Sequence, residues 1–428
     1  MTPITIIVSL FFSIIALNTK RGTALGILVL SVLLWPEYLR FSVFGIQMSA
    51  DRFVALCLLI KSFVRPEYRL GKLNSLDKII ILSFLWDIFA NLMGGADFAH
   101  VKWVIGRGLD TTLMYFVARY MIRSKGDLRD FIWPLLICGI VLGVLAGYES
   151  ITFYSPYQYL FKFHTWVWID RQAELRYGFL RAYGSSSHPI YFGISMFFLA
   201  AFLTSLRGIA LNSRFKNKKI LWTVGGVGAV LASFSSMSSG PIITMATFLV
   251  FSALFYKRSL ITPLKYLTVF MMVFVEIFSN RHFYNMVDYI ALNSATAWYR
   301  TKLLEVAISQ LHEYWLFGFK GRAPHHWGAL IDGRLIVDVV NNYIYSAVVS
   351  GLLGAIFLLV IQLKVIKNAL LLWGNGDEDL RKFAFGMCCL IISYFIGSMS
   401  VSVFGSGLVL SYIAYGLISD TLIYTKIK

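Results

Sequence analysis

The sequence predicts an all-α membrane protein that crosses the bilayer roughly 12–13 times. Three observations lead to this fold class: the composition, the spacing of the apolar segments and the distribution of the basic residues. Of 428 residues, 58% are hydrophobic and only 14% are charged, and the mean hydropathy is +0.69. Soluble domains carry about 25% charged residues. The composition therefore excludes an ordinary soluble protein and favours a single integral membrane domain over residues 1–428.

Apolar segments of roughly 17 to 23 residues recur along the whole chain, as a hydrocarbon core about 30 Å thick requires of a helix. The chain begins with an apolar segment that lacks a preceding basic residue and a small-residue cleavage site, so we do not expect a removable signal peptide. We expect helices at 3–18, 23–38, 47–64, 77–93, 108–123, 130–150, 187–206, 219–237, 239–256, 262–279, 339–362, 382–400 and 403–425.

Lysine and arginine occupy every second connection between these helices. Short connections rich in Lys and Arg stay in the cytoplasm, so the C-terminus is expected inside and, with thirteen crossings, the N-terminus outside. The net charge of +17 then marks the cytoplasmic face and its anionic lipids, and no nucleic-acid partner is predicted. The basic groups are Lys20/Arg21, Lys61/Arg65/Arg69/Lys72/Lys78, Arg123/Lys125/Arg129, Arg214/Lys216/Lys218/Lys219, Lys257/Arg258/Lys265, Lys364/Lys367/Arg381/Lys382 and Lys426/Lys428.

Two long connections are expected on the opposite face, at 151–186 and 280–338. Long connections between packed elements are usually functional. All seven histidines map to this face, and so do several arginines against the positive-inside trend. Guanidinium groups bind phosphate oxygens in bidentate fashion, although pairing with nearby carboxylates or lipid phosphates stays open. The residues are His100, His164, His188, His282, His312, His325 and His326, with Arg171, Arg176, Arg181, Arg281, Arg300, Arg322 and Arg334.

Three acidic residues, Asp87, Glu149 and Glu276, lie within the expected spans or at their outer ends. Charged groups in a membrane are costly and usually face a cavity or a partner. Asp87 is the deepest of the three, and an ion pair between helices is the alternative role for it. Gly139, Gly143 and Gly147 form a GxxxG series that predicts close packing of the helix at 130–150.

The second long connection contains "WYRTKLLEVAISQLHEYWLFGF", residues 298–319. Leu304, Ile308, Leu311 and Trp315 fall on one helical face, which predicts a helix on the membrane surface or one that caps the bundle. Arg300 stands at its expected start, where the free N–H groups and the helix dipole add to a phosphate site.

Three motifs together resemble a known family. They are "RAYGSSSHPIYFG" (181–193), with Arg181, Gly184, His188 and Pro189 at the matching positions; "WYRTKLLEVAISQLHEYWLFGFK" (298–320), with Arg300 and Gly318; and "NNYIYSAVVSGLLG" (341–354). Their order and common side resemble the O-antigen ligase/O-antigen polymerase superfamily (Wzy-like and WaaL-like proteins). Ligases of this family carry a histidine where Val340 stands, and Ser239 occupies a position that often holds arginine. The missing histidine favours a polymerase.

The resemblance implies a GT-C-like glycosyltransferase of the bacterial inner membrane, with short helices in a large periplasmic loop and the active site facing the periplasm or cell exterior. Its substrates would be undecaprenyl-diphosphate-linked oligosaccharide and an acceptor glycan for O-antigen, exopolysaccharide or capsule, possibly with a chain-length regulator as partner. No cofactor or metal is expected. Two other functions stay open, a ligase that transfers glycan to lipid or protein, and a transporter or flippase.

In the polymerase interpretation, arginines stabilise the leaving diphosphate by electrostatics. Arg181 and Arg300 are the first candidates, with Arg176 and Arg322 in support. A general base is expected among Glu149, Glu174, Asp338, His188 and His326, and the resemblance adds Asn341, Asn342 and Tyr343 as substrate-binding residues, with His326. Ser187 is also a suitable N-cap for the helix that begins at Pro189, because Pro is favoured in a first turn.

Overall fold

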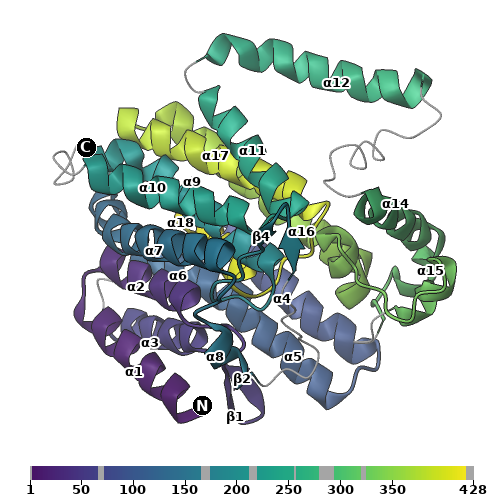
Figure 1. The fold of residues 1–428 in the computed structure, drawn as a ribbon, viewed down its shortest axis with the longest axis horizontal. Helices are drawn as coiled ribbons and strands as arrows, with labels where there is room; N and C mark the ends of the chain where they lie inside the picture. Colours follow the sequence, from purple (N-terminus) through teal and green to yellow (C-terminus); the bar gives the residue numbers. More distant parts are fainter. Residues whose placement is uncertain are drawn as a thin grey trace.

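The computed structural model describes residues 2–65, 72–164, 174–211, 219–254, 257–278, 294–319 and 324–420. Within these ranges the chain is mostly helical, and its strands form two short antiparallel hairpins, β1–β2 and β3–β4. The elements are α1 (Thr2–Asn18), α2 (Arg21–Leu34), β1 (Phe41–Val43), β2 (Ile46–Met48), α3 (Ala50–Val64), α4 (Ser75–Met93), α5 (Phe98–Gly108), the π-helix η2 (Leu109–Leu113), α6 (Met114–Met121), α7 (Lys125–Thr152), α8 (Gln158–Phe161), β3 (Leu175–Arg176), β4 (Phe179–Leu180), α9 (Pro189–Leu211), α10 (Lys219–Ser235), α11 (Ser239–Ala253), η3 (Arg258–Leu260), α12 (Ile261–Phe278), α14 (Ser294–Ser309), α15 (Leu311–Tyr314), η5 (His325–Leu330), α16 (Asn342–Asn375), α17 (Glu378–Ser398) and α18 (Gly405–Leu417) (Figure 1).

Each of the thirteen helices expected from the sequence coincides with a helix of the structure. Three differ most in extent. The helix expected at 108–123 begins ten residues earlier as α5 and continues through η2 into α6, and α16 runs to Asn375 rather than 362. The helix expected at 403–425 is α18, Gly405–Leu417, and the expected residues 421–425 lie outside the described ranges. Within the described residues, four helices are long and apolar enough to cross a membrane, and five others are apolar but shorter. The four are Lys125–Thr152, Pro189–Ala210, Asn342–Asn375 and Glu378–Ser398.

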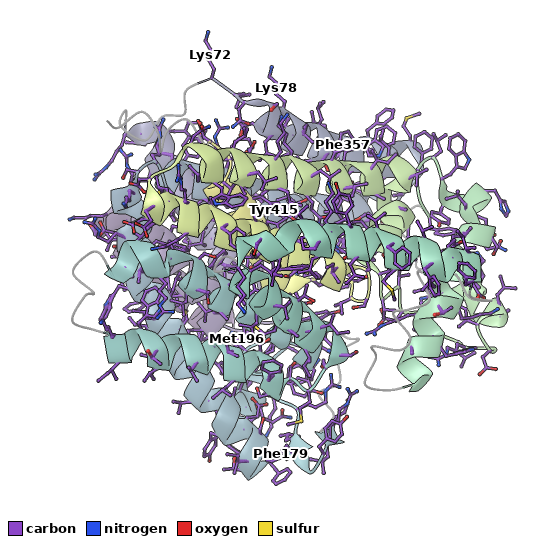
Figure 2. The ribbon with its side chains drawn as sticks, turned by 90° about the horizontal axis from the view of Figure 1, so that it is seen from above. Lys72, Lys78, Phe179, Met196, Phe357 and Tyr415 are labelled. Atoms are coloured by element: carbon purple, nitrogen blue, oxygen red, sulfur yellow. The ribbon has the colours of Figure 1, made fainter. Side chains whose placement is uncertain are left out.

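The core of the bundle is built around α9. This helix packs against α7, α10, α11, α17 and α18, and nearly all its side chains from Phe192 to Ala210 are buried. Figure 2 shows two labelled core residues, Met196 and Tyr415, well inside the molecule, whereas Phe179 and Lys78 lie at its edges. In Figure 1, α12 stands apart from the bundle, and most of its side chains are exposed.

The glycine series in α7 makes the close helix contact that the sequence predicts, and it does so against α10. A β-carbon on Gly139 would overlap the carbonyl of Gly225, and one on Gly143 would overlap the backbone of Gly228. Gly147 has open space around it. Two of the three glycines therefore bring α7 and α10 into backbone contact.

The connections gather at two ends of the bundle. At one, the basic end, Lys61 donates to the carbonyl of Thr19 at 3.0 Å and Lys125 pairs with Asp379 at 2.7 Å. At the other, which we call the long-loop end, Tyr157 donates to the carbonyl of Leu34 at 3.0 Å. The basic groups around Lys61 and Lys125 therefore lie at the end opposite the long-loop end.

We predict that Gly143→Leu lowers the melting temperature of the detergent-purified protein, because the new side chain must push α10 away. Overpacking of this kind costs about 1–3 kcal/mol. Gly147→Leu is the matched control, since it lies one helical turn away in open space, and it should melt like the wild type. Equal melting of the two variants would contradict the α7–α10 contact.

Candidate functional site

The segment "RAYGSSSH" lies at the long-loop end and is held by two buried carboxylates. Glu149, at the end of α7, accepts the backbone N–H groups of Tyr183 at 3.2 Å and Gly184 at 3.1 Å. Glu37, after α2, accepts the N–H of Ser187 at 3.2 Å and its hydroxyl at 2.7 Å. Both carboxylates are at most 8% exposed. Glu149, predicted as a general base, therefore serves as an anchor for the backbone.

His188, rather than Ser187, caps α9. Nδ1 of His188 accepts the N–H of Ile190 at 3.1 Å, whereas the Ser187 hydroxyl is bound to Glu37. Burial, and next the positive charge of Arg181, lower the pKa of His188 to about 4. The ring is then neutral near pH 7 and, with Nδ1 as acceptor, carries its proton on Nε2. This geometry leaves His188 without a free basic nitrogen for catalysis.

Three of the predicted arginines converge on the turn between α10 and α11, residues 236–239. Arg181 donates to the carbonyl of Ser236 at 3.1 Å, to the hydroxyl of Ser238 and to the carboxylate of Glu174. Arg176 donates to the carbonyl of Met237 at 2.9 Å, and Arg300 to the hydroxyl of Ser239 at 3.3 Å. We call this set the arginine cluster.

The roles of two of these arginines differ from those predicted. The Arg181 side chain is 3% exposed, and Nε, Nη1 and Nη2 all donate to protein acceptors, so it positions the turn rather than facing a ligand. Arg300 lies in the middle of α14, which begins at Ser294, so no helix N-terminus assists it. On α14, Leu303 and Val306 are buried against the protein, whereas Ile308, on the apolar face expected around Leu304, is 59% exposed.

Three predicted residues lie at the start of α16, and two of them join this helix to the segment 399–403. Asn341 caps α16 and donates through Nδ2 to the carbonyl of Met399 at 2.9 Å. Asn342 is 3% exposed and accepts the N–H of Val403, and Tyr343 donates to Gln362 at 2.8 Å. These contacts give all three a structural role.

The two other predicted residues of the second connection lie elsewhere. His326 pairs with Glu313 at 2.8 Å, and its side chain is 54% exposed. Arg322 lies outside the described residues.

Two adjoining cavities at the long-loop end form the best candidate site. The first, which we call the aromatic cavity, measures about 360 Å³ and is lined among others by His100, Trp103, Asp338, Tyr345 and Phe404. The second, the basic cavity, measures about 350 Å³, and its lining includes Arg40, Arg52, Lys102, Arg107 and Asp110. Trp103 and Phe404 line both cavities, so the two are neighbours, and we call the pair the recess.

Asp338 is the predicted site residue that the structure places in this recess. The Asp338 side chain is exposed at the aromatic cavity, and the protein around the cavity displaces enough water from the carboxyl to raise its pKa. The hydroxyl of Tyr299 holds the backbone of Asp338 on both sides, accepting its N–H at 2.9 Å and donating to its carbonyl at 2.7 Å. Among the described residues, Nε2 of His100 is buried and has no hydrogen-bond partner.

A break in α16 builds one wall of the aromatic cavity. Ser350 and Gly351 leave helical geometry, with φ +78° at Gly351. The loop after α15 enters the break: the N–H of Leu352 donates to the carbonyl of Trp315, and that of Phe319 donates to the carbonyl of Val348, each at 2.8 Å. Figure 1 shows α15 beside α16 at this point.

The sequence analysis missed the basic cavity. Its side chains come from the connection after α2, from α3 and from α5, and no motif links them. The available signal was the one used for the long loops, namely arginine on the face where the positive-inside trend disfavours it. Applied to short connections, it would have singled out Arg40 and Arg52.

The fold and the recess define an α-helical bundle with four helices that can cross a membrane and an ionisable recess at its long-loop end. No family model matches the chain, and no curated protein matches it. The resemblance to the O-antigen ligase/O-antigen polymerase superfamily therefore depends on the motifs alone.

We predict that Arg181→Ala lowers the stability of the protein by about 3 kcal/mol, because it removes a buried charge and leaves its acceptors unpaired. Arg300→Ala is the comparison, since Arg300 is only partly buried and should cost less. Melting of both purified variants measures the difference. A smaller loss for Arg181→Ala than for Arg300→Ala would contradict the positioning role.

Proposed function

We propose that the protein is a bacterial inner-membrane glycosyltransferase, a polysaccharide polymerase. In this proposal all thirteen predicted helices cross the membrane, and the long-loop end faces the periplasm. The place of the basic connections supports this orientation, because Lys61 and Lys125 lie at the opposite end, where the positive-inside rule places the cytoplasm. The enzyme would transfer an undecaprenyl-diphosphate-linked oligosaccharide to an acceptor glycan.

The observation that carries the proposal is the place of Asp338. It is a carboxyl group with a raised pKa in a cavity with aromatic walls, next to a cavity lined with cations. A glycosyl transfer of this kind needs a base for the attacking hydroxyl and positive charge for the departing diphosphate. Trp103, Tyr345 and Phe404 offer aromatic surfaces on which sugar faces can stack.

The reaction would proceed as a displacement at the anomeric carbon. Asp338 takes the proton of the acceptor hydroxyl, the oxygen forms a bond to the anomeric carbon, and the bond from that carbon to the diphosphate oxygen breaks. The electron pair leaves with undecaprenyl diphosphate. Preorganised cations lower the barrier because negative charge develops on this leaving group. Arg300 and Arg176 remain candidates for contacts to a second substrate near the arginine cluster.

A transporter is the second candidate, and the break in α16 is the observation that favours it, because interrupted helices often mark transport sites. In this protein the backbone groups at the break are satisfied by the loop: Trp315 and Phe319 pair with Leu352 and Val348. The break is thus filled by protein and builds a cavity wall, which fits an enzyme better than a pathway. A ligase would differ from the polymerase mainly in its acceptor, and Val340 in place of histidine disfavours it.

We predict that Asp338→Asn stops polymerisation in cells while the protein remains in the membrane at its normal level. Single lipid-linked repeats should accumulate, because substrates still bind but the proton has no acceptor; loss of a general base costs about 10²–10⁴-fold in rate. Asp332→Asn is the matched control: it lies in the same connection and is exposed, and its φ of +57° suits asparagine. Normal polymer length in Asp338→Asn would refute the assignment of the base.

We also predict an acid limb in the pH dependence of polymerisation by the purified enzyme. Asp338 accepts a proton only when ionised, and burial raises its pKa. The rate should therefore fall as the pH drops through this raised pKa, at higher pH than an exposed aspartate with a pKa near 3.9 would cause. His100 faces the same cavity, so His100→Gln must retain the limb, whereas the residual rate of Asp338→Asn must lack it.

A further inference from the structure

We propose that the basic cavity is a phosphate-binding site, separate from the arginine cluster, and that Lys102 and Arg107 are the residues that contact the phosphate. Its ligand would be the diphosphate of a lipid-linked sugar. The phosphate site itself follows from the cavity, and only the identity of the attached lipid and sugar rests on the proposed function.

The cavity draws its cations from three parts of the chain. Arg40 comes from the connection after α2, Arg52 from the first turn of α3, and Lys102 and Arg107 from α5. Four cationic side chains and one carboxylate, that of Asp110, line the same space. With a volume of about 350 Å³, it can hold a diphosphate and several waters.

Two of the four cations form a fixed wall. Arg52 makes a bidentate pair with Asp110, with both N–O distances 2.6 Å, and also donates to the carbonyl of Gln47. Arg40 donates through Nε to the carbonyl of Glu37 at 2.9 Å. These side chains hold positive charge in place without the cost of reorganisation when a ligand arrives.

The other two cations have their donors available. Within the described part of the chain, neither Lys102 nor Arg107 makes a recorded side-chain hydrogen bond or ion pair; each contacts an aromatic ring. Nζ of Lys102 lies 4.6 Å from the centre of the Phe98 ring, and the guanidinium of Arg107 lies 5.4 Å from that of Tyr345. Asp87 and Asp110 attract Arg107 electrostatically, but among the described residues neither carboxylate forms an ion pair with it. A guanidinium and an ammonium group in one recess are the donors that bind phosphate oxygens.

Gly45 keeps Lys102 in this position. Its φ is +81°, and a β-carbon there would come within 2.7 Å of Nζ. A side chain at position 45 would therefore force the ammonium group of Lys102 to shift.

The aromatic cavity lies next to the basic cavity and can hold a sugar attached to the bound phosphate. Because Trp103 and Phe404 line both cavities, a sugar attached to a phosphate bound between Lys102 and Arg107 would extend into the aromatic cavity beside Asp338. The arginine cluster, at the start of α11, would then be left for the second lipid-linked substrate.

The test measures binding of inorganic pyrophosphate to the full-length protein purified in dodecyl maltoside, a detergent without phosphate. We compare Lys102→Gln and Arg107→Lys with the wild type by calorimetry. Each variant should bind at least about tenfold more weakly, since each loses charge-assisted hydrogen bonds. Lys302→Gln is the matched control, because Lys302 is at the same end, is 39% exposed and pairs with Glu305; it should bind like the wild type.

Lys102→Gln and Arg107→Lys are both measured in case one of them fails to fold, and gel filtration shows which variant is intact. If intact Lys102→Gln or Arg107→Lys binds pyrophosphate like the wild type, or if the wild type does not bind it, the site is refuted. If Arg300→Ala instead abolishes binding, the arginine cluster is the phosphate site and the proposal is overturned.

Competition separates the two sources of phosphate. A short-chain polyprenyl diphosphate should displace pyrophosphate from the wild type, and phosphatidylglycerol added to the micelles should not. Displacement by phosphatidylglycerol would assign the cavity to a lipid headgroup and overturn its role for a substrate. Since binding is measured without polymerisation, loss of binding in the variants supports the site even if Asp338→Asn leaves polymer length normal and the proposed function fails.

Discussion

The long-loop end of this bundle depends on the hydrogen bonds that Glu37 and Glu149 accept. The segment 183–187 is buried without being helix or strand, so its N–H groups lack the partners that secondary structure supplies. A buried N–H left unpaired costs about 1–3 kcal/mol, and a carboxylate can accept several such groups at once. Glu149 serves Tyr183 and Gly184, and Glu37 serves Ser187 together with the N–H of Ser406 at the start of α18, at 2.8 Å. These two acceptors fix α2, α7, α9 and α18 relative to one another.

The cations at the long-loop end are of two kinds. Arg181 forms an ion pair with Glu174, and Arg52 forms one with Asp110. Among the described residues, the charged groups of Lys102 and Arg107 lie over ring faces and make no side-chain hydrogen bond or ion pair. The same residue type therefore positions a turn in one place and is available to a ligand in another. The groups that surround each side chain in the folded protein decide its role, and the order of charged residues along the sequence does not show which groups these are.

This difference also explains how far the sequence could predict the structure. The helices were predictable because the length of an apolar segment and the place of basic residues are local properties, and all thirteen coincide with observed helices. Of the site, Asp338 could be named, because it ends a long connection next to a recognisable helix start. Arg181 received the wrong role because its partners at 236–238 lie fifty-five or more residues away. The face of α14 that packs against the protein, through Leu303 and Val306, could not be predicted for a similar reason, because the surface that it meets decides it.

The break in α16 shows why the aromatic cavity is a fixed recess and not a space under a movable lid. Val348 and Val349 line the cavity, and the carbonyl of Val348 accepts the N–H of Phe319. On the other side of the break, the N–H of Leu352 donates to the carbonyl of Trp315. Between the loop residues Trp315 and Phe319, the ring of Phe317 packs against those of Trp86 and Phe89 of α4, with ring centres 6.3 and 6.2 Å apart. A lid would have to break these backbone hydrogen bonds and withdraw an aromatic side chain in order to open. The wall and the loop must therefore move together, so the fold itself sets the shape of this side of the aromatic cavity.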